Sequence, residues 1–165
     1  MYTVKQIEDA LIAALAPLKV GYVAEEGDPA VYATVREVRP YQGQLDSVAA
    51  LQAVVDVLPA IFLLYVRSDY AEHGSRKIEK MRFALFVCDQ SLRVEADEAR
   101  RGGAGNPGVY AILNGVRDLL YEKRLSLDIY PLTLVKEEAE VFVEGLSVYS
   151  AEYETAQSLL YPVGT

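Results

Sequence analysis

The feature that most constrains the fold is a short apolar segment, residues 60–66, which reads Ala-Ile-Phe-Leu-Leu-Tyr-Val. Pro59 precedes it, and the polar residues Arg67-Ser68-Asp69 follow it. An uninterrupted apolar run of roughly four to eight residues between such breaks is too short for a buried helix and is typical of a strand covered on both faces. We therefore predict a central strand here and expect the rest of the chain to cover it.

Two segments have the periodicity of long amphipathic helices. Residues 3–16 begin with Thr3 and Gln6, a pair that can form a capping box. A second helix is expected after Asn106-Pro107, which supply an N-cap and a first helical residue. Its apolar stripe consists of Val109, Ile112, Leu113, Val116, Leu119 and Leu120.

A short helix is predicted over residues 45–58, with Asp46 or Ser47 as its cap and Pro59 as its end. Residues 31–38 are ambiguous. The preceding Asp28-Pro29 can begin a helix, whereas the β-branched content favours a strand, and we favour the strand.

Further strands are predicted downstream of the central one. Residues 81–88 form a second apolar run, so the central strand, a polar loop at 67–79 and this run predict a long antiparallel hairpin. Three more extended pieces are expected at residues 129–135, 139–144 and 146–155. In the last piece the set that contains Tyr149, Ala151 and Tyr153 is the more apolar and should face the helices.

These elements predict an α+β domain that spans residues 1–165 as one unit. We expect an antiparallel or mixed β-sheet with two long helices packed on one face, the short helix on that face as well, a long hairpin and extended loops.

Composition excludes several classes of function. The net charge of −8 argues against a protein that binds nucleic acid by neutralising phosphates, so no specific nucleic-acid binding is expected. The single cysteine, Cys88, excludes an internal disulfide and a multi-cysteine metal site, and a buried free thiol is favoured. No segment approaches a membrane span, and the N-terminus lacks the pattern of a signal peptide, so we expect a protein that stays in the cytoplasm, without membrane contact.

The residues that could be catalytic or bind a ligand are better explained as solvated surface residues or as parts of a connector. His73 is the only histidine, and a solvated loop histidine is favoured over a catalytic or metal-binding one because no cluster of partners accompanies it. The acidic pairs, such as Asp97-Glu98, are interpreted as solvated charge. The glycine-rich residues 102–105 precede a helix but lack the lysine and hydroxyl residues of a phosphate loop. We therefore predict no catalytic, cofactor-binding or metal-binding residues, and no enzyme.

Three segments, taken in order, resemble the Mu-like phage tail-terminator family. The first extends from Val35 to Asp46 and contains Tyr41-Gln42-Gly43-Gln44-Leu45, which is similar to that family's Tyr-x-Gly-Glu/Gln-Leu element. The second is Pro59-Ala60 followed by the apolar strand. The third is the helix from Val109 to Leu120 with the later residues 132–134 and the strand at 146–154, which is similar to the family's closing half. Together with the opening helix, these segments extend over most of the chain.

The resemblance implies a structural α+β subunit. Tail terminators form a ring, usually a homohexamer, at the head-proximal end of the tail tube. The ring stops tail polymerisation, anchors the sheath end in a contractile tail and offers the surface for head–tail joining. The implied partners are other copies of the chain, the tail tube protein, the tail sheath protein and the head-completion or connector protein, while DNA passes through the lumen. The implied location is the tail or neck of the virion, after assembly in the host cytoplasm.

The candidate protein–protein interface lies in two polar segments, 67–79 and 91–106. The second is a charged, glycine-rich connector of a length that is uncommon unless it is functional or mobile. The candidate residues are Arg67, Asp69, Tyr70, Arg76, Lys77, Arg93, Arg100, Arg101, Gly102 and Gly103.

Two alternatives remain open at this point. One is a head-completion or connector protein of the neck, which gene order would distinguish from a terminator. The other is a small ligand-binding or enzymatic domain, which would need a polar cluster in a pocket.

Overall fold

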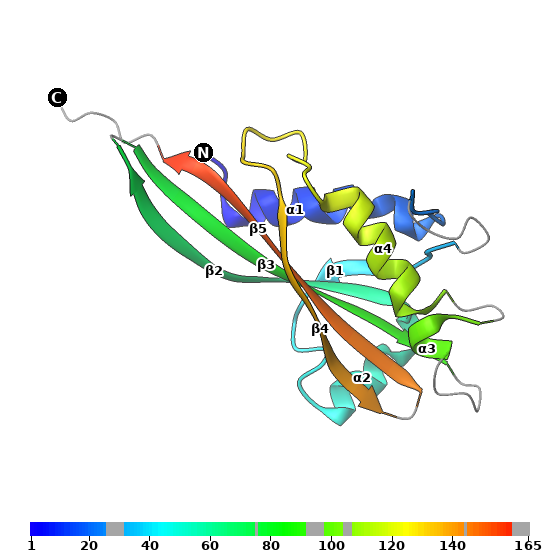
Figure 1. Ribbon diagram of the computed structural model, residues 1–165. Coiled ribbons are helices and arrows are strands. Elements are labelled where there is room, and N and C mark those ends of the chain that lie inside the picture. Colours follow the sequence, from blue (N-terminus) through cyan, green and yellow to red (C-terminus); the bar gives the residue numbers. More distant parts are fainter. Residues whose placement is uncertain (26–31, 75, 92–97, 104–106, 144, 160–165) are drawn as a thin grey trace.

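A computed structural model of the chain describes residues 1–25, 32–74, 76–91, 98–103, 107–143 and 145–159. These residues form an α+β fold around a five-stranded mixed sheet with the strand order β1-β2-β3-β5-β4 (Figure 1). The first strand pairs with the second in parallel, and all other neighbouring strands are antiparallel. The strands are β1 (Glu37–Pro40), β2 (Ala60–His73), β3 (Arg76–Gln90), β4 (Thr133–Val143) and β5 (Leu146–Leu159).

The helices lie on both faces of this sheet. The two longest are α1 (Val4–Ala14) and α4 (Gly108–Leu120), which pack against the same face. The short helices are η1 (Ala16–Lys19), α2 (Val48–Val54), η2 (Val55–Val57) and α3 (Glu98–Arg101). Because Val54 of α2 packs on the opposite face, the expectation that all helices share one face is wrong for the short helix.

Helix starts follow local capping chemistry in two cases. The capping box of α1 is present, with Thr3 accepting from the Gln6 backbone and Gln6 accepting from the Thr3 backbone. The side chain of Ser47 caps α2 by accepting from the Ala50 N–H at 3.1 Å. Asp46, the other candidate cap, accepts a hydrogen bond from the Tyr41 hydroxyl instead, at 2.6 Å.

The start of α4 differs from the prediction. The helix begins at Gly108, its cap residue is Pro107, and no side chain of the cap position bonds to it. Asn106 lies outside the described residues. The Gly108 N–H donates to the buried Asp89 Oδ2 at 2.9 Å. A carboxylate from the end of β3 therefore satisfies this helix terminus, where the favourable end of the helix dipole lies.

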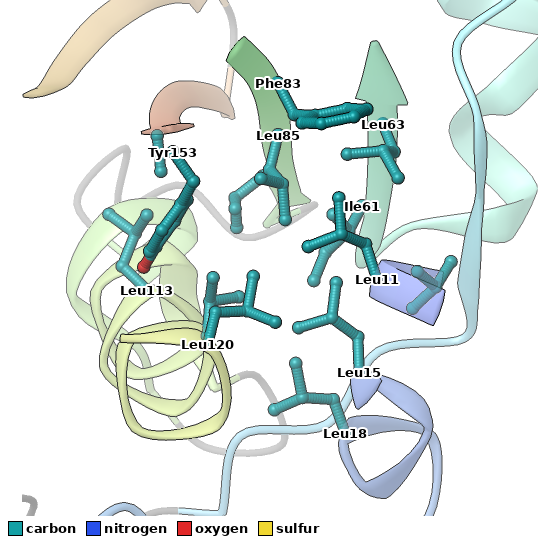
Figure 2. Packing of buried hydrophobic residues seen from close by; sticks show 14 of the residues in the cluster. Leu11, Leu15, Leu18, Ile61, Leu63, Phe83, Leu85, Leu113, Leu120 and Tyr153 are labelled. Carbon is teal, nitrogen blue, oxygen red and sulfur yellow. The ribbon is translucent and has the colours of Figure 1, made fainter. Parts of the chain in front are cut away.

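The main core lies between the sheet and the pair α1 and α4. Figure 2 shows its leucines meeting the large side chains of the strands. The labelled residues are Leu11, Leu15, Leu18, Ile61, Leu63, Phe83, Leu85, Leu113, Leu120 and Tyr153. The predicted stripe of α4 is confirmed, with Leu119 partly buried and its other members buried. The prediction that Ala151 and Tyr153 of β5 face the helices is confirmed as well.

A smaller core lies on the other face of the sheet. Along β2, Ile61 and Leu63 enter the main core, whereas Ala60 and Phe62 enter the smaller one. The predicted burial on both faces is therefore confirmed for residues 60–63. The middle strand of the sheet is β3, so β2 is not central in position.

The segment 67–79 is strand rather than loop, apart from a turn at Gly74 and residue 75, which is not described. β2 and β3 pair continuously from Ala60–Cys88 to His73–Arg76, with one register shift between Tyr65 and Arg67. The polar composition suggested a loop, but the register sets Asp69 opposite Lys80 and Glu72 opposite Lys77. Opposite charges on facing positions stabilise a strand pair, and that pairing is invisible before the register is known.

Two other predicted strands have different bounds. Of residues 31–38, only 37 and 38 lie in β1, which continues to Pro40; Ala33 forms an isolated bridge with Tyr22, and residue 31 is not described. In place of the two pieces expected at 129–135 and 139–144 there is one strand, β4, with register shifts at Leu134/Lys136 and Ala139/Val141. It begins at Thr133, so the prediction of strand is wrong for residues 129–132. Residue 144 is not described.

Candidate interaction arm and its family

The distal parts of three strands run out from the main core, in which Met81 and Tyr65 at their base still pack (Figure 1). This arm consists of residues 64–73 of β2, 76–82 of β3 and 154–159 of β5. Its tip lies past the first turn of α1, at the opposite end of the molecule from α3. A three-stranded sheet can hold its shape outside a core when its side chains brace it, and the contacts described next do so.

A carboxylate organises one face of the arm. Glu79 Oε1 accepts from the Ser68 hydroxyl at 2.8 Å and from the Tyr70 hydroxyl at 3.0 Å, while Gln157 Nε2 donates to Glu79 Oε2 at 2.9 Å. Partial burial acts to raise the pKa of Glu79, but the three hydrogen bonds outweigh burial and hold its pKa below the usual value. The ionised form of Glu79 therefore joins all three strands of the arm.

The same network fastens the start of the chain to the arm. The side chain of Gln157 is 2% exposed and makes a two-way contact with Tyr2. It accepts from the Tyr2 N–H at 2.7 Å and donates to the Tyr2 carbonyl at 2.8 Å. The Tyr2 hydroxyl in turn accepts from the Asp128 N–H at 3.2 Å. The outer part of the arm is thus tied to the start of the chain through Gln157, and Tyr2 links that start to the segment before β4.

Ion pairs brace the other face. Arg82 of β3 lies 3.0 Å from Glu154 and 3.7 Å from Glu152 of β5. Lys136 of β4 lies 3.3 Å from Glu152 and 2.7 Å from Glu138. Because these pairs are linked and Arg82 is only a quarter exposed, they form a network of the kind that holds geometry better than isolated surface pairs do.

The structure separates the predicted interface residues into two groups. Arg67, Asp69, Tyr70, Arg76 and Lys77 all lie on the arm. The other described candidates, Arg100, Arg101, Gly102 and Gly103, lie in or just after α3 at the far end of the molecule (Figure 1). Arg93 lies outside the described residues. The two polar segments therefore do not form one surface on a single copy.

The arm residues form contacts among themselves at the sheet edge. Arg67 Nε lies 3.0 Å from Asp69 Oδ2, and both side chains are more than half exposed. Lys77 Nζ stands 5.3 Å from the centre of the Tyr70 ring. At the other end, Arg100 approaches Tyr149, whose pKa is raised mainly by burial and partly lowered again by the Arg100 charge. Arg100 therefore contributes to contacts within the chain.

Sequence reasoning missed Glu79, Gln157 and Asp89, three polar residues that organise the arm and the α4 terminus. Glu79 and Gln157 are 78 positions apart, and Asp89 and Gly108 are 19 apart. No local motif links them, because each partner lies on a different element. None of them lies inside a strand that the sequence predicted, because Glu79 falls in the predicted polar loop, and Asp89 and Gln157 follow the predicted strands 81–88 and 146–155.

Two hollows flank the arm. One has a volume of about 530 Å³ and is lined by residues that include Arg76, Arg124, Asp128 and Tyr130. The other adjoins Ile78, Lys80 and Glu154, and shares Tyr130 with the first. Both lie between the arm and the segment that precedes β4, so the arm has concave flanks with mixed polar and apolar walls.

The described residues offer little support for a catalytic or metal-binding site. No group of three or more His, Cys, Asp or Glu side chains is placed to hold a metal ion in that part of the chain. Cys88 is buried, and burial raises the pKa of its thiol far above the usual value, as expected for an unreactive cysteine. The side chain of His73 is not described. Over the described residues, no helix has both the length and the apolar character that crossing a membrane requires.

Comparison with known proteins adds the family. The family model described as "Bacteriophage Mu, Gp37" matches residues 3–158, which is nearly the whole chain. A search of curated proteins found no match. The family match confirms the resemblance to Mu-like phage proteins that was based on the short segments around Tyr41, Pro59 and α4. The chain therefore belongs to the Bacteriophage Mu Gp37 family.

Proposed function

We propose that this chain is the subunit of a phage tail terminator. Membership of the Mu Gp37 family supports a structural, tail-related role in a phage. In the proposal, copies of the chain form a ring, expected to be a hexamer, on the head-proximal end of the tail tube. The ring stops tube growth, anchors the end of the sheath and presents the surface that the head connector joins.

The arm is the observation that carries the proposal. A ring subunit must reach its neighbours through two different surfaces, since only a head-to-tail contact closes by rotation into a ring. The arm extends away from the core, and internal hydrogen bonds and ion pairs hold it in place. It leaves α3 and its arginines at the opposite end, where a second partner can bind.

Charge supports the same role. The net charge of the chain is −8. An acidic ring repels the phosphate backbone and so allows DNA to pass through its lumen without binding. The proposed partners are the tail tube and tail sheath proteins and the head-completion protein of the neck, and the proposed location is the tail or neck of the virion.

Electron microscopy of lysates from a phage that lacks the gene tests this function. A terminator predicts overlong or unjoined tails beside normal filled heads, because nothing stops tube growth. Normal, joined tails of normal length would overturn the proposal. Tails of normal length that fail to attach to heads would show a connector of the neck instead. Restoring the gene from a plasmid is the control for effects on neighbouring genes.

A further inference from the structure

Three stretches of sheet edge lack a strand partner in the described part of the chain: the outer side of β1, residues 64–73 of β2, and the outer side of β4. β1 has four residues, so the two long open edges are those of β2 and β4, on opposite sides of the sheet. β1 pairs only with residues 60–63 of β2, so the ten residues 64–73 have a strand partner on one side alone. At the other edge, β4 pairs only with β5 along its 11 residues. Each edge presents unpaired backbone N–H and C=O groups, which can form a ladder with another strand.

The exposed side chains at these edges are partly apolar. On the arm, Val66 is 42% exposed and Tyr70 is 57% exposed. On β4, Val135 is 42% exposed. Burying large apolar side chains is favourable, so pairing of the two edges would be stabilised by removing these side chains from water.

Charge and topology favour β4 of a second copy as the partner of the arm. The hairpin of residues 64–82 contains five basic and three acidic side chains, whereas β4 contains one basic and three acidic side chains. Four of the five basic side chains lie on β3, and residues 64–73 carry Arg67 against Asp69 and Glu72, so the positive charge that favours β4 stands one strand behind the contact edge. A β4–β4 contact would set acidic edge against acidic edge. The antiparallel pairings also make β2 and β4 run in opposite directions, so a neighbouring copy in the same orientation presents β4 antiparallel to β2. Because β4 lies level with residues 60–67 of β2, its pairing with 64–73 requires a stagger along the strands, which strands tilted to the ring axis provide.

We propose that residues 64–73 of one copy pair with β4 of the next copy, so that one continuous sheet runs around the ring. The inference rests on the proposed ring and identifies the surfaces that close it. The two edges are different, which makes the contact head-to-tail and able to propagate. The register shifts in both strands and the charges at Arg67, Asp69 and Lys136 oppose indiscriminate pairing, so the match must be specific.

Cross-linking of introduced cysteines tests the contact in assembled tails. The chain has one cysteine, which is buried, so thiol reagents reach only the introduced residues. The variant Ala71→Cys/Ala139→Cys places one thiol on each edge at exposed alanines. A short bismaleimide that spans about two residues of register, roughly 7 Å, accommodates the unknown offset. We expect a ladder of multimers on a denaturing gel, which ends at the ring size.

Three controls make the result specific. Ala71→Cys and Ala139→Cys alone should each give monomers, whereas the two single variants assembled together should give dimers only. The double variant Ala71→Cys/Ala13→Cys carries its second thiol on an exposed position of α1, away from both edges, and should give no ladder. Dimers from Ala71→Cys alone would show that two arms meet, and a ladder from the α1 control would show proximity without pairing; either result would overturn the inference.

This test separates the inference from the function on which it rests. Monomers from the 71/139 variant, in tails that contain the protein and have normal length, would overturn edge pairing while leaving the terminator function intact. Normal joined tails in the lysate that lacks the gene would overturn the terminator function, whatever the gel shows. Tail length without cross-linker shows whether the substitutions themselves impair assembly.

Discussion

At the scale of single residues, glycine 108 shows how close two segments approach. Its φ of +76° is in the left-handed region, and a Cβ there would overlap the Gly102 nitrogen and lie 2.8 Å from the Arg101 carbonyl carbon. Both neighbours are backbone at the end of α3, so neither can move aside by changing a rotamer. Glycine is needed at position 108 because the start of α4 packs directly against the end of α3 there, while its N–H donates to Asp89.

Replacing this glycine should destabilise the fold strongly. For Gly108→Ala we expect a loss of roughly 2–5 kcal/mol in the free energy of unfolding, from backbone strain and the clash together. Gly74→Ala is the matched control, because its φ is +63° but no atom lies within 4 Å of the added Cβ. It should cost about 1–2 kcal/mol. Urea denaturation measures both, and equal losses would contradict the close approach.

At the scale of elements, the arm depends on one ionised side chain that joins its three strands. Glu79 accepts from Ser68, Tyr70 and Gln157, and these bonds lower its pKa. A carboxyl whose pKa is lower in the folded chain stabilises the fold above its unfolded pKa. It loses that contribution as the pH falls through the folded pKa.

Glu79→Gln should therefore destabilise the chain at neutral pH, and the difference from wild type should shrink as the pH falls below about 4. Glu8→Gln is a control, because the pKa of Glu8 is raised in the folded chain whereas that of Glu79 is lowered. Burial, followed by the charge of Asp9, raises the pKa of Glu8, so neutralising it should leave stability unchanged or slightly higher at neutral pH. Chemical denaturation at a series of pH values measures both differences. Parallel profiles for the two variants would show that the network around Glu79 does not act through its charge.

At the scale of the whole molecule, the arm is the more basic part of an acidic chain, and this asymmetry suits head-to-tail association. The arm and β4 occupy opposite edges of one sheet. Each copy therefore carries both edges of the proposed contact, but the two edges cannot pair within one copy.

Contacts of this kind should weaken with salt, because exposed charges are screened. We expect tails washed at rising ionic strength to release the chain, and the variant Glu138→Lys to be released at lower salt than wild type. Glu25→Lys, which changes the charge equally at an exposed position outside both edges, should behave like wild type. Immunoblotting of the washed tails measures retention. Release that is the same for both variants would argue against an electrostatic role for β4.

Local patterns predicted the elements that depend on neighbours in sequence. The capping box of Thr3 and Gln6, the stripe of α4 and the burial of residues 60–63 on both faces are all present. They could be predicted because helix capping and side-chain periodicity act within a few residues. The short motifs around Tyr41, Pro59 and α4 carried the resemblance to a phage family, and the family match confirms it.

The sequence by itself therefore determined the α+β class, the apolar faces and the family. Only the tertiary structure decided that 67–79 is strand, that α2 lies on the second face, and that the predicted interface residues divide between two ends. Polar residues are strand or loop according to the partner opposite them, and Glu79 meets Gln157 only when the sheet has formed. Which edges stay open is a property of long-range pairing, which no local pattern contains.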